Sequence, residues 1–347
     1  MIPKEFRLES YDYHLPQNLI AQYPSPQREE SRLLVLDQAT GKIKHHLRFR
    51  EITRYFKAGD ILVVNDTKVF PARLLGRKPT GGQVEILLLR LPQAGEPVPA
   101  LYRGKRPRPG LKISFSEALE GEIVKVEEGG KVEIILSGPQ ELLPLLEKIG
   151  RVPLPPYIKR LPEVEDLFRY QTVYAQKAGS VAAPTAGFHF TRALLDTLRE
   201  KGVTLATITL HVGYGTFAPV KTKDIRAHKI HEEYVEIPSE TACAINEARQ
   251  KGGALFAVGT TVLRALEFSA RETGRVRPIS AWCDLYIYPG YRFQVVDHLI
   301  TNFHLPRSSL LILVSAFAGR KVILKAYQEA IQKGYRFFSY GDAMLIL

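Results

Sequence analysis

The stretch GDILVVNDTKVFPARLLG, residues 59–76, contains the features that decide the fold. A turn at residues 59–60 precedes an unbroken apolar run, residues 61–64, which predicts a strand. The polar residues NDTK follow at once, so a loop is expected where this strand ends. From Arg73 onward the texture of the sequence changes, which indicates a domain boundary inside this stretch.

Residues 73–150 are typical of a small unit made mainly of strands. Short runs such as VEILLLR, ALYRG, LKISF, GEIVKV and KVEIILS alternate with turn clusters such as TGG, RPRPG and EEGG. EEGG between two alternating runs predicts a hairpin, and PQELLPLLEKIG adds one helix before the proline-rich connector VPLPP. We therefore expect a β-rich domain, residues 73–150, inserted into a discontinuous body formed by residues 1–72 and 151–347.

The rest of the chain alternates helices with strands. Beyond the connector, the pattern predicts helices over residues 191–201 and 240–251 and strands over residues 203–212 and 254–258. A further helix over residues 321–333 carries apolar residues on one face at helical spacing. This alternation indicates a mixed α/β body.

The chain of 347 residues carries 48 Lys plus Arg against 36 Asp plus Glu, a formal charge of +12. That excess favours a polyanionic partner, with nucleic acid ahead of an anionic membrane, although charge of this size can also serve solubility alone. We expect neither a signal peptide nor a membrane span, and the distant Cys243 and Cys283 indicate neither disulfides nor a thiolate metal site. A cytoplasmic protein is expected.

Two familiar motifs are considered and rejected. GYGTFA, residues 213–218, matches a dinucleotide-binding turn in form, but Pro219 and the polar residues after it do not make the helix that would hold a pyrophosphate. His228 and His231 suggest zinc, yet no further ligands stand at a recognisable spacing, so we expect no metal. No Walker A sequence and no G-x-S-x-G elbow is present.

Basic residues gather in two predicted loops, and these clusters are more informative than the total charge. A solvated surface is the alternative explanation, but two prolines keep the first cluster extended, which suits a strip of phosphate contacts. The residues predicted to bind tRNA are Arg103, Lys105, Arg106, Arg108 and Lys112 in the first cluster and Lys221, Lys223, Arg226 and Lys229 in the second.

The segment GSVAAPTAGFHF, residues 179–190, is typical of a loop around a flat ligand. Small residues and a proline lead to His189, which stands between two aromatics just before a helix that Thr191 can cap. An adenine ring or a flipped base could stack on Phe188 or Phe190 while His189 handles a proton. A buried crossover, in which the histidine only caps a carbonyl, is the alternative.

Three further loops extend this pattern. In AVGTTVLRALE, the segment from Gly259 to Thr261 could hold a carboxylate or phosphate, or could simply cap the helix that follows. TNFHLPRSSLL places Asn302, Phe303 and His304 before another helix. RFFSYGDAM adds Tyr340 and Asp342.

Together, eight segments resemble the S-adenosylmethionine:tRNA ribosyltransferase-isomerase family of queuosine biosynthesis. They are YDYHLPQNLIAQYP, SRLLVLD, GDILVVNDTKVFPARLLG, GSVAAPTAGFHF, TLHVGYGTFAPV, AVGTTVLRALE, TNFHLPRSSLLILVSAFAG and YRFFSYGDAM. The resemblance covers nearly the whole chain, with Phe188 standing where leucine is expected. It implies an α/β body around a barrel-like sheet with a small inserted β-barrel.

The resemblance also implies the reaction. S-Adenosylmethionine donates its ribosyl group to 7-aminomethyl-7-deazaguanine in the wobble position of a tRNA anticodon, adenine and methionine leave, and the ribose is rearranged to give epoxyqueuosine. Such chemistry needs a base for the carbon beside the sulfonium, an acid or hydrogen bond for departing adenine, and a cavity that excludes water. A monomer that needs no metal is expected.

On this resemblance we assign candidate roles. The base is His189 or His211, with Asp66 and Asp342 as alternates, because histidine titrates nearest to neutral pH. The residues predicted to bind the cosubstrate are Asn65, Thr67, Lys68, Thr185, Phe188, Phe190, Gly213, Gly215, Thr216, Gly259, Thr260, Thr261, Arg264, Asn302, Phe303 and His304.

Two rival functions suit the basic charge. A tRNA methyltransferase would use the same cosubstrate, but its glycine-rich loop after a first strand is not found near the N-terminus. A non-catalytic RNA-binding module would leave the loop histidines and aspartates unexplained.

Overall fold

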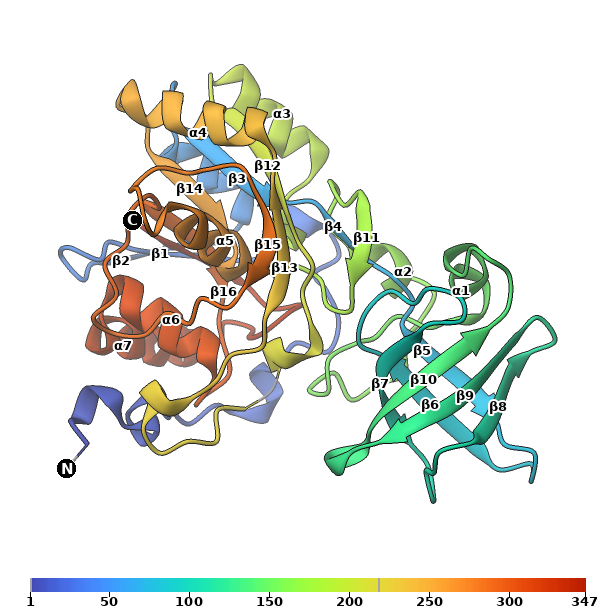
Figure 1. Ribbon diagram of the computed structural model, residues 1–347. Coiled ribbons are helices and arrows are strands. Elements are labelled where there is room, and N and C mark those ends of the chain that lie inside the picture. Colours follow the sequence, from blue (N-terminus) through green and yellow to red (C-terminus); the bar gives the residue numbers. More distant parts are fainter. Residues whose placement is uncertain (1, 218) are drawn as a thin grey trace.

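The computed structural model describes residues 2–217 and 219–347. Figure 1 shows two parts side by side, a large α/β body and a smaller β-barrel coloured in teal and green. The predicted α/β class and the small barrel are both confirmed.

A nine-stranded mixed sheet forms the centre of the body, in the order β15-β13-β12-β3-β14-β16-β17-β1-β2. Its strands are β1 (Leu33–Leu36), β2 (Ile43–His46), β3 (Ile61–Asn65), β12 (Thr204–Leu210), β13 (Glu233–Ile237), β14 (Leu255–Val258), β15 (Ile279–Cys283), β16 (His298–Asn302) and β17 (Ala343–Ile346). The neighbours β12, β3, β14 and β16 run parallel, so their carboxyl ends meet at one edge of the sheet.

Both faces of this sheet are covered. Along β3, Ile61 and Val63 pack into one apolar cluster while Leu62 and Val64 pack into another, as the two-residue period of a strand requires. Residues of α4 (Ser239–Gln250), α5 (Thr260–Ala270), α6 (Ser309–Ala318) and α7 (Arg320–Gln332) belong to the first cluster, and those of α3 (Arg192–Glu200) and the 3-10 helix η5 (Phe49–Tyr55) to the second.

The smaller part is a closed barrel in the order β10-β7-β6-β5-β8-β9. Its strands are β5 (Arg73–Arg77), β6 (Gln83–Leu88), β7 (Pro97–Arg103), β8 (Leu111–Ser116), β9 (Leu119–Val126) and β10 (Lys131–Ser137), and α1 (Leu143–Ile149) follows. The predicted EEGG hairpin is confirmed as the antiparallel pair β9–β10. At Gly76 a Cβ would lie 2.4 Å from the Ile113 side chain, so only glycine lets these strands close over their core.

Two adjacent segments join the barrel to the body. The backbones of Arg73 and Arg151 exchange hydrogen bonds of 3.2 and 2.8 Å, and at Gly150 a Cβ would lie 2.3 Å from the Pro71 carbonyl oxygen. On the body side, β4 (Thr67–Val69) pairs in parallel with β11 (Lys177–Ser180), and the one-turn α2 (Asp166–Arg169) lies beyond the connector. That residues 73–150 fold as an independent domain stays a prediction.

Helix and strand positions agree with the sequence pattern wherever apolar periodicity is strong. Helices α3, α4 and α7 and strands β12 and β14 differ from their predicted bounds by at most two residues at each end. The remaining short 3-10 helices are η1 (Lys4–Phe6), η2 (Leu8–Tyr11), η3 (Gln17–Leu19), η4 (Arg28–Glu30), η6 (Glu128–Gly130), η7 (Thr185–His189), η8 (Tyr214–Phe217) and η9 (Ile225–Ala227). Across residues 2–217 and 219–347, none of the helices combines the length and apolar character needed to cross a membrane.

Helix α5 is fixed to the loop before β16 by Glu267, which is fully buried. One carboxylate oxygen accepts the N–H groups of Val295 and Val296 at 3.0 and 3.1 Å, and the other accepts the N–H of Gln294 at 2.8 Å. A buried carboxylate is stable only when such donors replace its hydration. This contact sets the position of β16 relative to α5.

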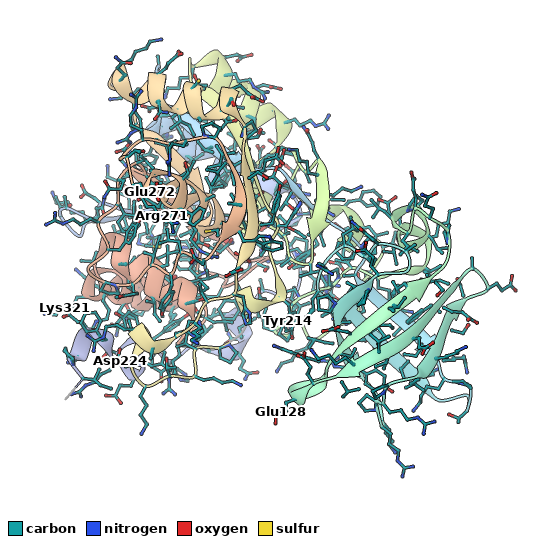
Figure 2. All side chains as sticks on the ribbon, in the orientation of Figure 1. Glu128, Tyr214, Asp224, Arg271, Glu272 and Lys321 are labelled. Atoms are coloured by element: carbon teal, nitrogen blue, oxygen red, sulfur yellow. The ribbon has the colours of Figure 1, made fainter. Side chains whose placement is uncertain are left out.

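The variant Glu267→Gln should lower the free energy of unfolding by about 1–3 kcal/mol, because its amide group would face an N–H donor that then lacks an acceptor. Urea unfolding followed by fluorescence measures the loss. Glu272→Gln is the matched control: this residue, labelled in Figure 2, is 60% exposed and pairs with Arg277 at the surface, so its loss should stay within about 0.5 kcal/mol. Equal losses in both variants would contradict the role given to Glu267.

Candidate active site

A cavity lies at the carboxyl edge of the parallel strands. It encloses about 670 Å³ of space between atoms, part of it open to solvent. Its walls are residues 182–186, 259–261, 301–305 and 338–339, together with Tyr157, Val212, Ser308 and Leu310. A crevice outside the carboxyl ends of parallel strands is where α/β proteins commonly bind ligands. The structure thus brings together four loops that the sequence singled out separately.

The N-terminus of α5 forms one wall. Gly259 adopts φ +93°, a conformation that favours glycine, and so turns the chain from β14 into the helix. Thr260 and Thr261 then present the first N–H groups of the helix, and no side chain caps them. The Thr261 hydroxyl is buried without a hydrogen-bond partner in the described part of the chain. Free amides, the helix dipole and this hydroxyl favour an anionic group here.

Asn302 lies at the end of β16, the strand next to β14, and is held by a hydrogen-bonded chain. Its Oδ1 accepts the Thr185 hydroxyl at 2.8 Å, and its Nδ2 donates to Nε2 of His189 at 3.2 Å. Nδ1 of His189 lies 2.6 Å from the Ser31 hydroxyl, which in turn donates to the Arg28 carbonyl. Burial, helped by the charges of Arg336 and Arg28, lowers the pKa of His189 to about 3, so its ring is neutral.

Residues 65–67 make polar contacts with neighbouring strands. Asn65 donates to the Leu210 carbonyl and accepts its N–H, at 2.9 and 3.0 Å, where β3 and β12 end. Asp66 accepts the hydroxyl of Thr209 at 2.6 Å. These three residues do not line the cavity, and Lys68 forms an ion pair with Glu147 at 3.1 Å on the barrel side. Their predicted contacts with a cosubstrate stay predictions.

His211 is half-buried beside these strands. Its Nδ1 lies 2.8 Å from the Thr67 hydroxyl, and its ring stacks on Tyr234 with centroids 5.9 Å apart. Gly179 allows the ring to approach, since a Cβ there would lie 2.6 Å from it. Burial lowers the pKa of His211, partly offset by the nearby Asp66 carboxylate. Within the described residues no hydrogen bond engages Nε2.

Arg264 does not line the cavity. Its guanidinium lies 2.5 Å from the Glu233 carboxylate and also donates to the Leu285 carbonyl at 3.1 Å. The second oxygen of Glu233 accepts the N–H of Gly213 at 2.9 Å. This buried ion pair therefore positions the glycine loop after β12. At Gly215 a Cβ would lie 2.3 Å from the His231 ring, and the side chain of Thr216 lies outside the described part.

The predicted stacking residues occupy different surroundings. Phe190 is fully buried against Phe49, and Phe188 packs on Tyr170 and Tyr340. Phe303 does line the cavity, although its ring belongs to a cluster of aromatics behind the wall.

His304 and Asp342 are held by other parts of the body. Nε2 of His304, in the cavity wall, lies 2.8 Å from the Thr301 hydroxyl, and burial lowers the pKa of this histidine to about 3. Asp342 does not line the cavity: its oxygens accept the N–H groups of Arg32 and Arg336, both at 2.8 Å, and burial is the main cause of its raised pKa.

Sequence reasoning gave no role to several residues of the wall, and three of these contribute an aromatic ring or a hydroxyl pair. Phe338 lines the cavity at φ +71°, a strained conformation for a residue other than glycine. Tyr157 and Ser339 also line it, with their hydroxyls 2.6 Å apart. The motif RFFSYGDAM contains Phe338 and Ser339, but Tyr340 and Asp342 in the same motif carry the more obvious chemistry.

The two basic clusters lie on separate parts of the fold. In the first cluster Lys105, Arg106 and Arg108 lie in the exposed β7–β8 loop of the barrel, but Arg103 is the last residue of β7 and Lys112 lies in β8, so the prediction of a loop was wrong for these two. The second cluster surrounds η9 on the body. Arg226 of the second cluster is paired with Asp224, a residue labelled in Figure 2, at 2.7 Å. Figure 2 also shows Tyr214 between the two parts, where it packs against the barrel core.

Neither histidine of the H-x-x-H pair is placed in a metal-binding group. His228 packs edge-on against Tyr286, and His231 lies against Gly215. In the described ranges, 2–217 and 219–347, no three His, Cys, Asp or Glu side chains are grouped closely enough to hold a metal ion.

The neutral state of His189 predicts an acid sensitivity. A histidine whose pKa is lowered by folding stabilises the fold fully above its unfolded pKa, about 6.5, and this contribution is lost as the pH falls toward 3. Between pH 6 and 4 the unfolded wild type binds about one proton more than the folded wild type, at His189. The unfolding free energy of the wild type should therefore fall more steeply with decreasing pH than that of His189→Gln, by the slope that one proton gives. Urea unfolding at several pH values measures this. The control variant His14→Gln, at an exposed position, should show the same dependence of unfolding free energy on pH as the wild type. If His189→Gln also showed the wild-type dependence, the assignment would be contradicted.

Comparison with known proteins shows the family of this chain. A family model described as queuosine biosynthesis protein matches residues 8–346. The chain is 52% identical to an S-adenosylmethionine:tRNA ribosyltransferase-isomerase from Aquifex aeolicus and 50% identical to one from Syntrophotalea carbinolica, in each case over 98% of this chain and 100% of the relative. A crystal structure of S-adenosylmethionine tRNA ribosyltransferase from Thermotoga maritima matches 97% of this chain and 100% of its own, at 37% identity and a TM-score of 0.55. The chain belongs to the queuosine biosynthesis protein family.

Proposed function

We propose that this protein is an S-adenosylmethionine:tRNA ribosyltransferase-isomerase that acts in the cytoplasm as a monomer. It transfers the ribosyl group of S-adenosylmethionine to 7-aminomethyl-7-deazaguanine in the wobble position of a tRNA, and releases adenine and methionine. One observation carries the proposal: four loops that bear the family resemblance form the walls of a single cavity. Full-length relatives with this activity in their names support it.

The cosubstrate fits the polarity of the cavity. The α5 N-terminus, with Gly259, Thr260 and Thr261, receives the methionine carboxylate, since it offers free amides and an unpartnered hydroxyl. Thr185 and Asn302, which line the same cavity, offer further hydrogen-bonding groups. No Asp, Glu, Lys or Arg of the described chain lines this space, so the sulfonium meets no counter-ion that would stabilise it before reaction.

Proton transfer is assigned to His211 ahead of His189. Neither histidine lines the cavity, but Val212, the neighbour of His211, does. A base needs an accessible nitrogen: both ring nitrogens of His189 are engaged within a buried network, whereas no hydrogen bond of the described chain engages Nε2 of His211. We therefore give His189 the task of orienting Asn302. Asp66 and Asp342 remain the alternates, each with at least one oxygen occupied.

The other predicted residues shape the site or meet the tRNA. Asn65, Thr67 and Arg264 fix the strand ends and the Gly213–Gly215 loop, and Phe303 supports the wall against which a ring can lie. The exposed basic clusters on the barrel and around η9 supply phosphate contacts outside the cavity.

The proposal predicts specific products. The protein is incubated with S-adenosylmethionine and tRNA that bears the aminomethyl-deazaguanine, and the small molecules are identified by mass spectrometry. Adenine and methionine in equal amounts are expected. S-Adenosylhomocysteine would indicate a methyltransferase instead, and tRNA binding without turnover would indicate a binding module.

Replacing His211 should affect the chemical step. His211→Gln is expected to lower kcat for adenine release by about 100-fold or more, because a general base commonly contributes that much. His189→Gln, its matched variant, should retain kcat within about tenfold and raise KM for the cosubstrate, as expected for a positioning residue. Single-turnover adenine release separates the two parameters, and thermal unfolding confirms that both variants fold. Undiminished kcat in His211→Gln would refute its role.

A further inference from the structure

Exposed apolar side chains gather on the segment that contains α2. Leu161, Val164 and Phe168 are 73%, 77% and 70% exposed, and Leu167 is 43% exposed. Four exposed apolar side chains thus stand within eight residues, and exposed apolar side chains grouped in this way commonly mark a binding site.

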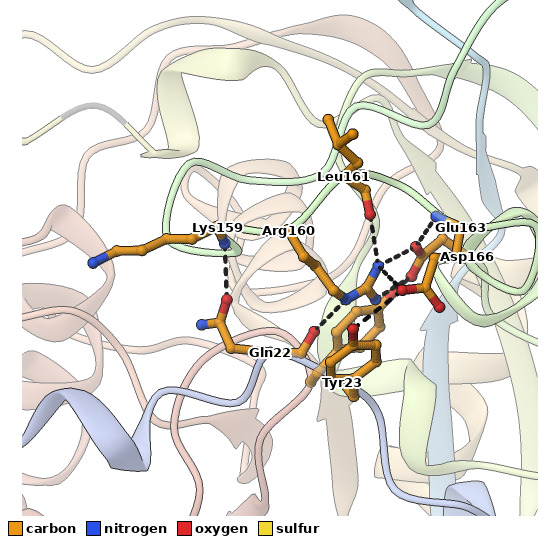
Figure 3. A network of polar contacts seen from close by, with 8 residues as sticks. Gln22, Tyr23, Lys159, Arg160, Leu161, Glu163 and Asp166 are labelled. Carbon is orange, nitrogen blue, oxygen red and sulfur yellow. Dashed lines mark hydrogen bonds and ion pairs between the residues drawn. The ribbon is translucent and has the colours of Figure 1, made fainter.

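This segment is held firmly in place. Arg160 forms a bidentate ion pair with the buried Asp166, at 2.6 and 2.8 Å, and also donates to the Gln22 carbonyl at 2.9 Å. Tyr340 donates to the same carboxylate at 2.7 Å, and the Arg160 guanidinium lies 4.2 Å above the ring of Tyr23. Figure 3 shows Leu161 directed away from this network. The apolar side chains are therefore presented by a rigid support, which lowers the entropic cost of binding.

A cleft adjoins this surface between the body and the barrel. It encloses about 1200 Å³ of space, part of it open to solvent, and Leu167 and Phe168 form one side of it. Three cations, Arg28, Lys68 and Arg192, face the same space, against a single acid, Glu147, which is paired with Lys68. The cleft therefore carries an excess of positive charge.

Two of these cations have no acidic partner. Arg28 donates to the carbonyls of Phe168 and Phe188, at 2.8 and 3.2 Å, and forms no ion pair in the described part of the chain. Burial, together with the neighbouring Arg169, lowers the pKa of Arg28 to about 10. Arg192 is exposed and makes no hydrogen bond or ion pair with the residues the structure describes. Uncompensated guanidinium groups beside an aromatic surface suit a phosphate next to a base.

A buried polar group also lacks a partner in this cleft. Thr172 lines it with a hydroxyl that is buried and forms no hydrogen bond within residues 2–217 and 219–347. The cleft is close to the catalytic cavity, because Val69 and Val152 on its wall pack in one apolar cluster with Ala183, which lines the cavity. A chain that delivers one nucleotide to the cavity can place a neighbouring nucleotide here.

We propose that Phe168 and the adjoining apolar side chains stack with an unpaired nucleotide of the acceptor tRNA that flanks the modified one, while Arg28 and Arg192 hold its phosphate. This inference rests on the proposed function, since it assigns a docking site to the same acceptor. Stacking on an aromatic ring is the usual way in which proteins bind unpaired nucleotides, and the two cations favour RNA over a second copy of this basic chain.

The test separates stacking from charge. Phe168→Ala should weaken binding of the acceptor tRNA by about tenfold and leave the dependence of log Kd on log salt unchanged. Arg192→Gln should weaken binding and also reduce that salt slope by about 0.7, the value for one lost phosphate contact to a single strand. Fluorescence anisotropy from 50 to about 300 mM salt measures both. In turnover assays, KM for tRNA should rise while kcat at saturating tRNA is retained.

Matched controls lie elsewhere on the surface. Leu47→Ala removes an equally exposed apolar side chain, and Lys321→Gln removes one charge far from the barrel, as Figure 2 shows. Both should bind tRNA as the wild type does. If the Phe168 and Arg192 variants bound tRNA with wild-type affinity and salt slope and turned over normally, the proposed docking site would be overturned while the proposed function would stand. Loss of self-association in sedimentation, with tRNA binding unchanged, would instead assign the surface to a second copy. Failure of the wild type itself to release adenine would overturn the proposed function.

Discussion

Buried acceptors that satisfy backbone N–H groups are the interaction on which the architecture around the cavity depends. Asp60 accepts the N–H groups of residues 57 and 254 before β3 begins, and Asn65 pairs with the Leu210 backbone where β3 ends. Glu233, Glu267 and Asp342 each fix a loop in the same way. Strands buried on both faces leave polar backbone groups at their ends that water cannot reach, so a side chain must replace the missing partner. The loops that form the walls are consequently specified by these contacts.

Those parts of the fold that depend on apolar periodicity could be predicted from the sequence. Residues 61–64 read as a strand, and the runs of residues 73–137 read as a strand-rich unit, because side chains repeat at the period that burial requires. The short strands β1 and β17 and the N-terminal 3-10 helices escaped prediction. Four-residue runs carry too little periodic signal, and the turns of residues 2–32 are held by contacts distant in sequence, such as Arg32 with Asp342.

The site is predictable only as a set of loops, for a reason that particular residues make clear. Thr67 and Arg264 have the residue types expected of ligand contacts, yet Thr67 joins Ser180 and His211 while Arg264 joins Glu233. A polar residue that hydrogen-bonds the backbone at a strand end and a polar residue that binds a ligand are of the same types and stand at the same positions, so the sequence does not distinguish them. Phe338 is the opposite case, a wall residue whose type does not suggest a site. It adopts a positive φ, and residue type predicts a positive φ only for glycine.

The distribution of charge separates the two tasks that the proposed reaction demands. The described walls of the cavity are neutral, and burial keeps the one histidine among them, His304, uncharged. In the proposed complex the helix amides bind the methionine carboxylate, and the sulfonium lies among neutral groups, so it keeps its electron-withdrawing effect on the adjacent carbon, which contact with an Asp or Glu carboxylate would weaken. The cations lie outside, around the barrel loop, around η9 and at the junction cleft that includes Arg28 and Arg192, where the proposed function requires positive charge to attract the phosphates of the acceptor. Because the neutral cavity and the surface cations lie in different places, the proposed function lets one fold bind a cationic cosubstrate and a polyanionic acceptor at once.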